Sequence, residues 1–275
     1  MTSKIPNSRR NLDLAIQRKF GGEYLRIRTL MANALVAQML PSGAVKGGSA
    51  IKLRFGDVET RFSDDLDTVQ GKNLQTFIRL LEIELTKGWN GFTGHIISKP
   101  PAKPEGIPSE YVMQPFEVKL SYNEKSWLTV KLEVGHNEIG DADNPDWNIS
   151  PNVTDIFEQL GFPSPGPVPL MPLHHQIAQK LHGASKPKSN RAHDLIDLQL
   201  ITAKEPVDYL KTKKTCQELF KYRQGQAWPP AIVKNAGWDK LYVNESESLP
   251  VLKSADDAVT WANKLIHTIE NSEQA

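Results

Sequence analysis

Residues 47–67, GGSAIKLRFGDVETRFSDDLD, decide the expected fold, because a Gly-Gly-Ser turn is followed along the chain by Asp65-Leu66-Asp67. Side chains of a β-strand alternate between its faces, so Asp65 and Asp67 are expected on one face, about 6–7 Å apart at their Cα atoms. Carboxylates in this arrangement can share a hard divalent cation such as Mg²⁺, which also takes waters and substrate phosphates as ligands. The segment therefore predicts metal-assisted transfer at a nucleoside triphosphate.

The size and composition of the chain set outer bounds on its organisation. Its 275 residues are 39% hydrophobic and 24% charged, enough for one large domain or for a core domain with a helical extension. The formal net charge of +1 gives no global field typical of a nucleic-acid-binding protein. Basic residues concentrate instead in residues 1–30 and 204–234, where they could contact a phosphate backbone or form solvated helix faces.

Apolar periodicity predicts most of the secondary structure. Helical spacing is found over residues 10–40, with a break at Gly21 and Gly22, and over residues 72–87. Strands are expected at residues 44–46, 95–98, 111–122 and 127–134, where β-branched residues alternate with polar ones. Residues 135–172 are expected to form a long connection with a brief helix at 153–160, and the chain beyond it is expected to be mostly helical.

Two blocks of the sequence carry a shared pattern. The first is GG(S/T)AL-x-LR followed by R-x-S-x-D-L-D, matched here by Gly47, Gly48, Ser49, Ala50, Leu53, Arg54, Arg61, Ser63, Asp65, Leu66 and Asp67. The second is a helix with a lysine, a basic loop and R-x-x-D-x-x-D-L, matched by Lys180, Arg191, Asp194 and Asp197. In this order and separation the blocks resemble the AbiEii/AbiGii family of minimal nucleotidyltransferases, the toxins of bacterial toxin–antitoxin and abortive-infection systems.

The resemblance implies an α/β (α+β) fold. Residues 1–150 would form a nucleotidyltransferase-like mixed β-sheet core flanked by helices, and residues 151–275 a mostly helical domain that closes the nucleotide cleft. It also implies a catalytic metal site in which Asp65 and Asp67 bind Mg²⁺ or Mn²⁺. The nucleotide-binding residues implied by the match are Gly47, Gly48, Ser49, Arg61, Ser63, Arg191, Asp194 and Asp197.

Roles within this set follow from the same resemblance. Gly47, Gly48 and Ser49 would cradle phosphate through backbone amides and a hydroxyl. Arg61 and Ser63, together with Lys180, would position the triphosphate.

Glu133 is the candidate for a third carboxylate. In LTVKLEV, residues 128–134, apolar side chains fill one face of the expected strand and leave Glu133 on the other. In nucleotidyltransferase folds a carboxylate in this kind of position, more commonly Asp, is the base for the incoming hydroxyl or a further metal ligand. A solvent-facing strand glutamate is the alternative.

Lys180 and the two downstream aspartates admit two interpretations each. Helical spacing places Lys180 at the margin of a buried face, where its ammonium could extend into a cleft and offset phosphate charge, or could simply reach solvent. Asp194 and Asp197 share one helix face. They could orient Lys180 or the base and ribose of the nucleotide, or could pair with Arg191 and hold the helices together.

Four histidines are further candidates for a metal site. His174, His175, His182 and His193 crowd one stretch, but lack the spacing and supporting carboxylate of known zinc helices. No Gly-x-Ser-x-Gly elbow, P-loop or Gly-x-Gly-x-x-Gly occurs, which argues against hydrolases, ATPases of the P-loop class and dinucleotide enzymes.

Aromatic and guanidinium planes in the basic segment offer a further possibility. Tyr222, Arg223 and Trp228 could stack on the bases of a nucleic acid. The alternative is that the aromatic rings belong to the core.

The compartment follows from what the sequence lacks. Cys216 is the single cysteine, which excludes an intramolecular disulfide and argues against a cysteine-based zinc site. No apolar run approaches the roughly 18–20 residues that span a bilayer, and the residues after Arg9 and Arg10 are too polar for a signal-peptide core. A cytoplasmic protein with no membrane partner is therefore expected.

Together these observations predict an enzyme that transfers a nucleoside monophosphate from a nucleoside triphosphate to an acceptor. The resemblance implies a bacterial toxin with a cognate antitoxin as partner, and RNA, in particular the 3′ end of tRNA, as the acceptor. Two alternatives stay open. The acceptor could be a protein or a small molecule, or the fold could serve as a catalytically silent module that binds RNA or a protein.

Overall fold

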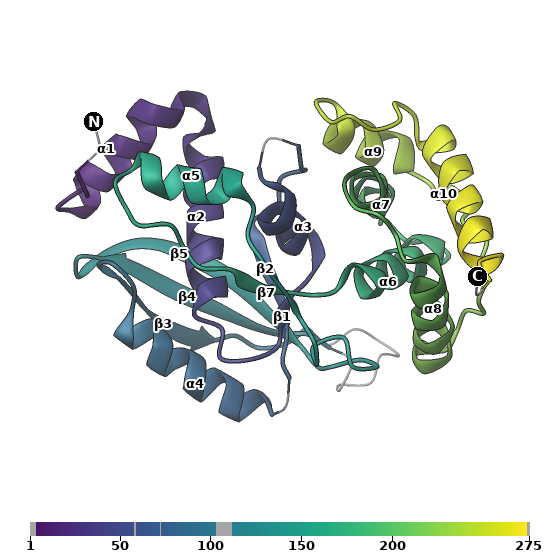
Figure 1. Ribbon diagram of the computed structural model, residues 1–275, viewed down its shortest axis with the longest axis horizontal. Helices are drawn as coiled ribbons and strands as arrows, with labels where there is room; N and C mark the ends of the chain where they lie inside the picture. The colour runs from purple at the N-terminus through teal and green to yellow at the C-terminus, as the bar shows by residue number, and fades with distance from the viewer. Residues whose placement is uncertain (1–3, 58, 72, 103–111, 274–275) are drawn as a thin grey trace. The chain divides into compact units, whose positions relative to one another are not determined.

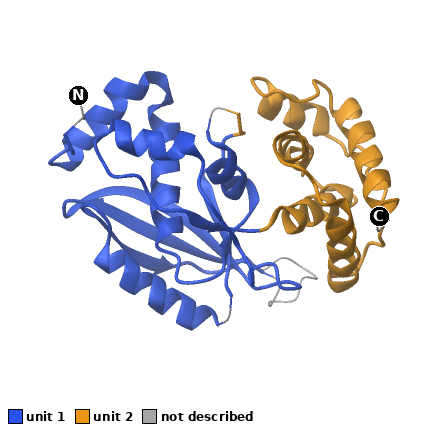
Figure 2. Cartoon of the chain, in the orientation of Figure 1, with its two compact units in different colours: residues 1–58, 62–171 blue, residues 59–61, 172–275 orange. Residues whose placement is uncertain are grey.

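The computed structural model describes residues 4–57, 59–71, 73–102 and 112–273 (Figure 1). Its contacts divide the chain into two compact units, shown in Figure 2. Unit 1 comprises residues 1–58 and 62–171, and unit 2 comprises residues 59–61 and 172–275. This division falls after residue 171, whereas the sequence led us to expect a border at residues 150 and 151.

Unit 1 is built on a seven-stranded mixed sheet. Its strands are β1 (Ala44–Val45), β2 (Asp65–Val69), β3 (Phe92–Ser98), β4 (Gln114–Tyr122), β5 (Lys125–Gly135), β6 (Asp146–Asn148) and β7 (Val168–Leu170). They lie in the order β3-β4-β5-β2-β1-β7-β6, with β2 parallel to β5 and antiparallel to β1. The expected strands at 44–46, 95–98, 111–122 and 127–134 are confirmed, except that Tyr111 lies outside the described residues.

The two faces of the sheet differ in polarity. On β5, Val130, Leu132 and Val134 are buried, whereas Lys131 is exposed and Glu133 half-buried. Neighbouring residues of a strand point to opposite faces, so the apolar residues share the face that packs on the helices of unit 1. The opposite face of β2 and β5 is left for charged side chains.

Two helices open unit 1 and cover the apolar face. Helix α1 (Arg9–Phe20) begins where the Ser8 hydroxyl accepts a hydrogen bond from the Asn11 amide. A short 3₁₀ turn at Gly21–Glu23 separates it from α2 (Tyr24–Gln38), which is almost wholly buried in its second half. The predicted break at Gly21 and Gly22 is therefore confirmed.

Two further helices pack into the same core. Helix α4 (Leu74–Lys87) is capped by Asn73 and buries Phe77, Leu81 and Leu85. It confirms the expected helix over 72–87, whose first residue, Lys72, lies outside the described residues. Helix α5 (Pro151–Gln159) confirms the brief helix expected at 153–160, and it packs on α2 within unit 1.

The segment expected as one long connection contains two strands that sequence reasoning missed. Strands β6 and β7 pair with each other, and β7 also pairs with β1, so they extend the sheet beyond the expected core. Each has only three residues, and β7 contains Pro169 opposite Trp147 of β6. Three residues are too few to show an alternation of apolar and polar side chains, and a proline within β7 weakens the strand pattern further.

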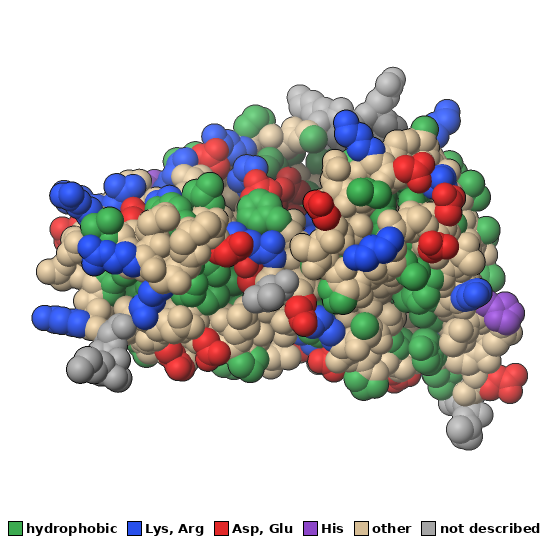
Figure 3. Space-filling view, turned by 90° about the horizontal axis from the view of Figure 1, so that it is seen from above, with side chains coloured by type: hydrophobic (Ala, Val, Ile, Leu, Met, Phe, Trp, Pro, Cys, Tyr) green, Lys and Arg blue, Asp and Glu red, His purple; other side chains and the backbone are tan. Residues whose placement is uncertain are grey.

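Basic residues near the N-terminus fall into two groups. Arg26 and Arg28 are used inside unit 1, where they form ion pairs with Asp57 and Asp13 at 2.5 and 3.2 Å. The exposed basic residues of α1 are Arg9, Arg10, Arg18 and Lys19. Lys and Arg side chains gather at this end of unit 1, on the left of Figure 3. The basic residues of α1 are therefore exposed, which fits both a solvated helix face and contact with a phosphate backbone.

Unit 2 is helical, as expected for the C-terminal part. Its helices are α6 (Leu173–Ser185), α7 (His193–Lys204), α8 (Tyr209–Arg223), α9 (Trp238–Ser246) and α10 (Ala255–Glu270). Helix α6 packs against both α7 and α8. Within the described residues, none of the helices of either unit has the length and apolar character needed to cross a membrane.

Candidate active site

Strand β2 presents the carboxylate pair beside a third carboxylate on β5. In the parallel register Asp67 lies opposite Glu133, and Asp65 lies opposite Lys131. Directly paired residues of neighbouring strands project from the same face, so Asp65, Asp67 and Glu133 share the charged face of the sheet. The strand and the facing of the pair, both expected from the sequence, are confirmed.

Negative charge on this face is only partly compensated. Burial raises the pKa of Glu133, and the charges of Asp67 and Asp65 raise it further against the opposing effect of Lys46. Asp65 Oδ1 is shielded from solvent and has no hydrogen-bond partner, with Lys131 Nζ 3.5 Å away. A bound cation would relieve the repulsion between like charges placed together on this face.

The donor set fits a divalent cation of the hard type. Among the described residues, no group of three or more His, Cys, Asp or Glu has an arrangement that could hold a metal ion by itself. Mg²⁺ is held in many enzymes by one or two carboxylates together with waters and substrate phosphates, so the pair Asp65 and Asp67 is sufficient for it. The Asp65 oxygen that has no hydrogen-bond partner is consistent with this donor set.

Helix α3 (Gly47–Phe55) begins beside Asp67. The Gly-Gly-Ser segment, expected as a turn, is in fact the first turn of this helix, and the preceding Lys46 amide donates to the Asp67 carbonyl at 2.8 Å. Gly47 has φ of 65°, and a Cβ there would lie 2.6 Å from Asp67 Oδ2. A glycine is therefore required where the helix start approaches the carboxylate.

The start of α3 offers an anion site. Amides in the first turn of a helix have no acceptor within the helix and lie at the positive end of its dipole. Gly47, Gly48 and Ser49 therefore stand where phosphate oxygens are commonly bound. The Ser49 hydroxyl has a different partner, because it donates to the Asp65 carbonyl and accepts from Asn33 Nδ2.

Buried cations hold α3 in place, a feature that sequence reasoning missed. Lys52 is 2% exposed and forms an ion pair with Asp57 at 3.1 Å. Arg54 donates to Asp146 Oδ2 at 2.8 Å and to the Met171 carbonyl at 3.2 Å, which ties α3 to β6 and to the residue after β7. Both residues lie on one helix next to the Gly-Gly-Ser segment, but Asp146, the acidic partner of Arg54, is 92 residues away in sequence.

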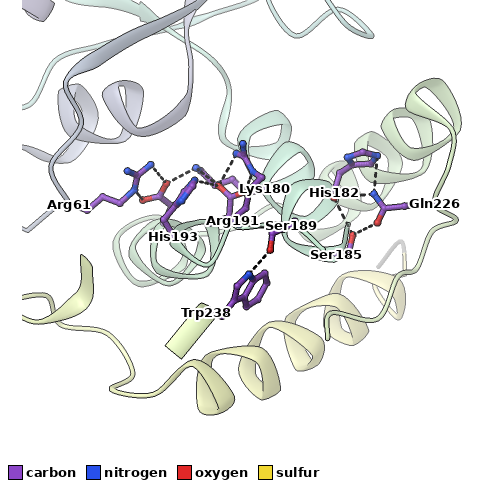
Figure 4. A network of polar contacts seen from close by, with 11 residues as sticks. Arg61, Lys180, His182, Ser185, Ser189, Arg191, His193, Gln226 and Trp238 are labelled. Carbon is purple, nitrogen blue, oxygen red and sulfur yellow. Dashed lines mark hydrogen bonds and ion pairs between the residues drawn. The ribbon is translucent and has the colours of Figure 1, made fainter. Parts of the chain in front are cut away.

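Unit 2 contains a second cluster of the predicted residues (Figure 4). Lys180 Nζ donates to Asp197 Oδ2 at 2.6 Å and to Asp194 Oδ1 at 3.3 Å. Arg61 donates through Nε and Nη2 to both oxygens of Asp197, at 2.9 and 3.2 Å. Arg191 donates in the same forked manner to Asp194, at 2.5 and 3.1 Å. All five predicted residues are therefore brought together.

Both aspartates are fully buried and ionised. Burial alone raises the pKa of Asp197, but Lys180 and Arg61 outweigh it and hold the pKa well below its usual range. Asp194 behaves in the same way, with Lys180 and Arg191 as the opposing charges. Burial lowers the pKa of the neighbouring His193 to about 4, so its ring is neutral at pH 7.

The position of Lys180 differs from the margin of a buried face that helical spacing predicts. The residue is only 4% exposed, and its ammonium lies between two carboxylates. The sequence left two roles open for Asp194 and Asp197, orienting Lys180 and pairing with basic residues. Both kinds of contact occur, because the two aspartates contact Lys180 and also pair with Arg191 and Arg61.

Gly183 is a further element of this cluster that the sequence did not reveal. A Cβ at this position would lie 2.5 Å from Arg191 Nε and 2.8 Å from Asp194 Oδ2. The absence of a side chain therefore admits the forked ion pair next to α6. In the sequence, the sign of this role is that Gly183 lies three residues after Lys180, one helical turn away.

The remaining predicted residues lie outside these contacts. Ser63 is half-buried just before β2. On α6, burial lowers the pKa of His174 to about 4, with the charge of His175 acting in the same direction, and its ring lies 2.9 Å from the Thr215 hydroxyl.

Comparison with known proteins identifies the family and the fold. A family model described as nucleotidyl transferase AbiEii toxin, type IV TA system, matches residues 29–264. No curated protein sequence matches the chain. The nucleotidyltransferase toxin MenT4 of Mycobacterium tuberculosis H37Rv has a similar structure, with a TM-score of 0.57 and 15% identity over 97% of this chain and 90% of that one.

A second solved structure, a putative nucleotidyltransferase from H. pylori, has a TM-score of 0.50 and 18% identity over 93% of this chain and 100% of that one. At such identities the structural matches establish the fold, and the mixed α/β nucleotidyltransferase-like fold expected from the sequence is confirmed. The family model covers most of the chain and both blocks of predicted site residues. The chain belongs to the AbiEii family of nucleotidyl transferase toxins of type IV toxin–antitoxin systems.

Proposed function

We propose that the protein transfers a nucleoside monophosphate from a nucleoside triphosphate to RNA, with the 3′ end of tRNA as acceptor. It would act in the bacterial cytoplasm as a toxin that a cognate antitoxin restrains. The observation that carries the proposal is the placement of Asp65 and Asp67 on β2 beside the first turn of α3. Paired carboxylates next to an anion site are the parts that triphosphate chemistry requires.

The predicted site residues of unit 1 have separate tasks in the proposed reaction. Asp65 and Asp67 would hold Mg²⁺ or Mn²⁺, which supplies charge neutralisation to the triphosphate when bound. The amides of Gly47 and Gly48 would donate to phosphate oxygens. The Ser49 hydroxyl supports the site from behind, because its bond to the Asp65 carbonyl fixes the distance between α3 and β2.

The chemical step is a displacement at the α-phosphorus. The acceptor hydroxyl oxygen forms the new bond to phosphorus, the bond to the bridging oxygen of the β-phosphate breaks, and pyrophosphate leaves. The hydroxyl proton would pass to the carboxylate of Glu133, which lies opposite Asp67 in the strand register. Positioning and charge neutralisation, with no covalent enzyme intermediate, provide the rate enhancement.

Lys180, Arg61 and Arg191 match the pattern of the family, and on that ground we include them in the proposal as residues that interact with the triphosphate. Asp194 and Asp197 fix Lys180, Arg61 and Arg191 in place before the nucleotide arrives, so little rotamer entropy is lost on binding. We assign contacts with the β- and γ-phosphates to Lys180 and Arg61. Ser63 would add a hydroxyl to the same task.

The test is transfer of label from each α-³²P-labelled nucleoside triphosphate to total tRNA in the presence of Mg²⁺. The wild type should label RNA, and Asp65→Asn should reduce the rate roughly 100-fold or more, the range lost when one group of an electrostatic site is removed. Asp64→Asn is the matched control, because Asp64 is the adjacent exposed carboxylate paired with Lys131 at 2.7 Å. Equal rates for Asp65→Asn and the wild type would refute the site.

Two further experiments test the metal dependence of the reaction and the identity of the acceptor separately. Omission of divalent cations should abolish labelling, and added Mn²⁺ should restore it. Label recovered on protein or on a small molecule while RNA stays unlabelled would keep the site and overturn the acceptor. Expression of the wild type in bacteria should arrest growth, whereas the Asp65→Asn variant should not.

A further inference from the structure

A cavity of about 300 Å³ opens on unit 2, away from the residues assigned so far. It is lined by Gln217, Phe220, Lys221, Gln226, Ala227, Trp228 and Glu270. These come from α8, from the segment that follows it and from the end of α10. Ligand pockets in proteins start at about this volume, so the cavity suits a small planar group better than a long chain segment.

Aromatic rings form the floor of this cavity. Phe220 packs edge to face on Trp228, with ring centroids 5.4 Å apart, and on His182, with centroids 4.9 Å apart. Phe220 is buried, whereas Trp228 is half-buried, so Trp228 keeps part of its ring open to the cavity. A ring with one exposed part and one packed edge can serve as a stacking platform.

The walls of the cavity are fixed in advance. Trp228 Nε1 donates to Glu270 Oε2 at 2.6 Å, and Lys213 lies 3.5 Å from the other oxygen of Glu270 and offsets its charge. Gln226 is bound to α6, because Ser185 donates to its Oε1 at 2.9 Å and its Nε2 donates to the His182 carbonyl at 3.2 Å (Figure 4). Little ordering of these side chains is therefore needed when a ligand binds.

Positive charge runs along the helix that borders the cavity. Lys211, Lys214 and Lys221 of α8 are exposed and form no ion pair within the part of the chain that the structure describes. At 3.6 residues per turn they lie within an arc of roughly 80° on the helix surface. Glu218 is the acidic residue on that face, so positive charge prevails.

We propose that this cavity binds one base of a single-stranded nucleic acid, stacked on Trp228, while the lysines of α8 contact the phosphates on either side. An aromatic platform combined with a basic track is the combination by which single strands are bound without base pairing. The cavity and the row of lysines match the size of one base and the charge of the phosphates beside it. The site differs from the carboxylate site and does not depend on catalysis.

Binding is measured by fluorescence anisotropy of labelled 12-nucleotide single-stranded RNA and DNA, without nucleoside triphosphate or divalent cation. Trp228→Leu should weaken binding roughly 5- to 150-fold, the range for loss of one stacked base, and Trp228→Phe should retain most of it. Trp147→Leu is the matched control, because Trp147 is 63% exposed on β6 of unit 1. Circular dichroism and thermal melting verify that each variant is folded.

Salt dependence tests the charged part of the site without touching the aromatic floor. Lys221→Gln should lower the slope of log affinity against log salt by about 0.7, the value for one phosphate contact to a single strand. Lys240→Gln, at an exposed position of α9, should leave the slope unchanged. Photocrosslinking of a 4-thiouridine strand should place the adduct in the peptide that contains Trp228.

The outcomes separate this site from the proposed transfer reaction. Asp65→Asn should lose transfer and keep strand binding, whereas Trp228→Leu should lose binding. Failure of the wild type to bind any single strand would overturn the inference, as would equal affinity of the wild type, Trp228→Leu and Lys221→Gln. Stronger binding to duplex than to single strands would also overturn it, because a paired base cannot enter the cavity.

Discussion

The two candidate clusters use the same residue types in opposite ways. On β2 and β5 of unit 1, the charges of Asp65 and Asp67 raise the pKa of Glu133, and an oxygen of Asp65 lacks a hydrogen-bond partner. In unit 2, Asp194 and Asp197 are more deeply buried, yet cations surround both. Carboxylates that share one face and repel one another favour the binding of an external cation, whereas the aspartates of unit 2 hold the cations of the chain itself in place.

This difference predicts which cluster holds the protein together. Removing one member of a buried ion network leaves its partners charged and unsolvated, which is costly. Removing one member of a group of like charges relieves repulsion instead. Stability and activity should therefore separate between the two clusters.

The largest expected effect is that of Asp197→Ala. Lys180 and Arg61 would lose a fully buried partner, so the free energy of unfolding should fall by about 3–5 kcal/mol. Urea denaturation of the full chain measures it. Asp65→Asn, which removes transfer in the proposed reaction, should leave that free energy within about 0.5 kcal/mol.

Asp256→Ala provides a surface reference for the same measurement. Asp256 pairs with Lys234 at 2.7 Å, but its side chain is 70% exposed. Exposed ion pairs contribute about 1 kcal/mol or less. If Asp197→Ala cost no more than Asp256→Ala, the view of the buried cluster as the anchor of unit 2 would be wrong.

Acid should weaken unit 2 through the same aspartates. Asp194 and Asp197 have lowered pKa values in the folded state, so their stabilisation is complete above the unfolded value of about 3.9 and is lost as the pH falls below it. The loss should be of the order of 2 kcal/mol, as for one ion-paired aspartate. Urea midpoints at pH 6, 4 and 3 measure it.

An Asp197→Asn variant serves as the internal reference for this pH series. It starts from lower stability and should show a shallower decline, because one of the two titrating carboxylates is absent. If the urea midpoints of the wild type and of Asp197→Asn fell equally as the pH is lowered, other groups would cause the loss of stability in acid.

A smaller effect is expected at the start of α3. Gly47→Ala places a Cβ 2.6 Å from Asp67 Oδ2 and forces a residue with a side chain to φ of 65°. Strain of this kind costs roughly 1–2 kcal/mol. The displaced carboxylate should also slow transfer, measured as kcat with saturating nucleotide.

Gly22→Ala is the matched control for this substitution. No atom lies within 4 Å of a Cβ built at Gly22. Its stability and transfer should match the wild type. Equal behaviour of Gly47→Ala and Gly22→Ala would show that α3 can shift without disturbing the carboxylate pair.

Local patterns were sufficient to predict much of unit 1. Strand alternation gave the shared face of Asp65 and Asp67 and the outward position of Glu133, and helical spacing gave α4 and α5. The pairing of Asp67 with Glu133 could not be derived from spacing, because register depends on contacts between distant segments. Strands β6 and β7 were missed because three residues carry no period.

The burial of Lys180 shows a different limit. Helical spacing shows which face of a helix is apolar. It does not show whether a charged residue on that helix has a partner of opposite charge elsewhere in the chain. Here a second partner of Asp197 is Arg61, which lies in a three-residue segment, residues 59–61, that belongs to unit 2 although the chain before and after the segment belongs to unit 1. Such long-range compensation decides whether a lysine reaches solvent or is held inside, and no local pattern encodes it.

The smallest effect sharpens the comparison inside unit 1 itself. Ser49→Ala removes the hydroxyl that donates to the Asp65 carbonyl, so the free energy of unfolding should fall by about 1 kcal/mol. Ser63→Ala, at a half-buried position just before β2, should change it by less than about 0.5 kcal/mol. If Ser49 acts by fixing β2 behind the carboxylates, kcat should fall while KM for the nucleotide stays near its wild-type value. A rise in KM with kcat unchanged would instead mean that the hydroxyl leaves the Asp65 carbonyl and binds phosphate directly.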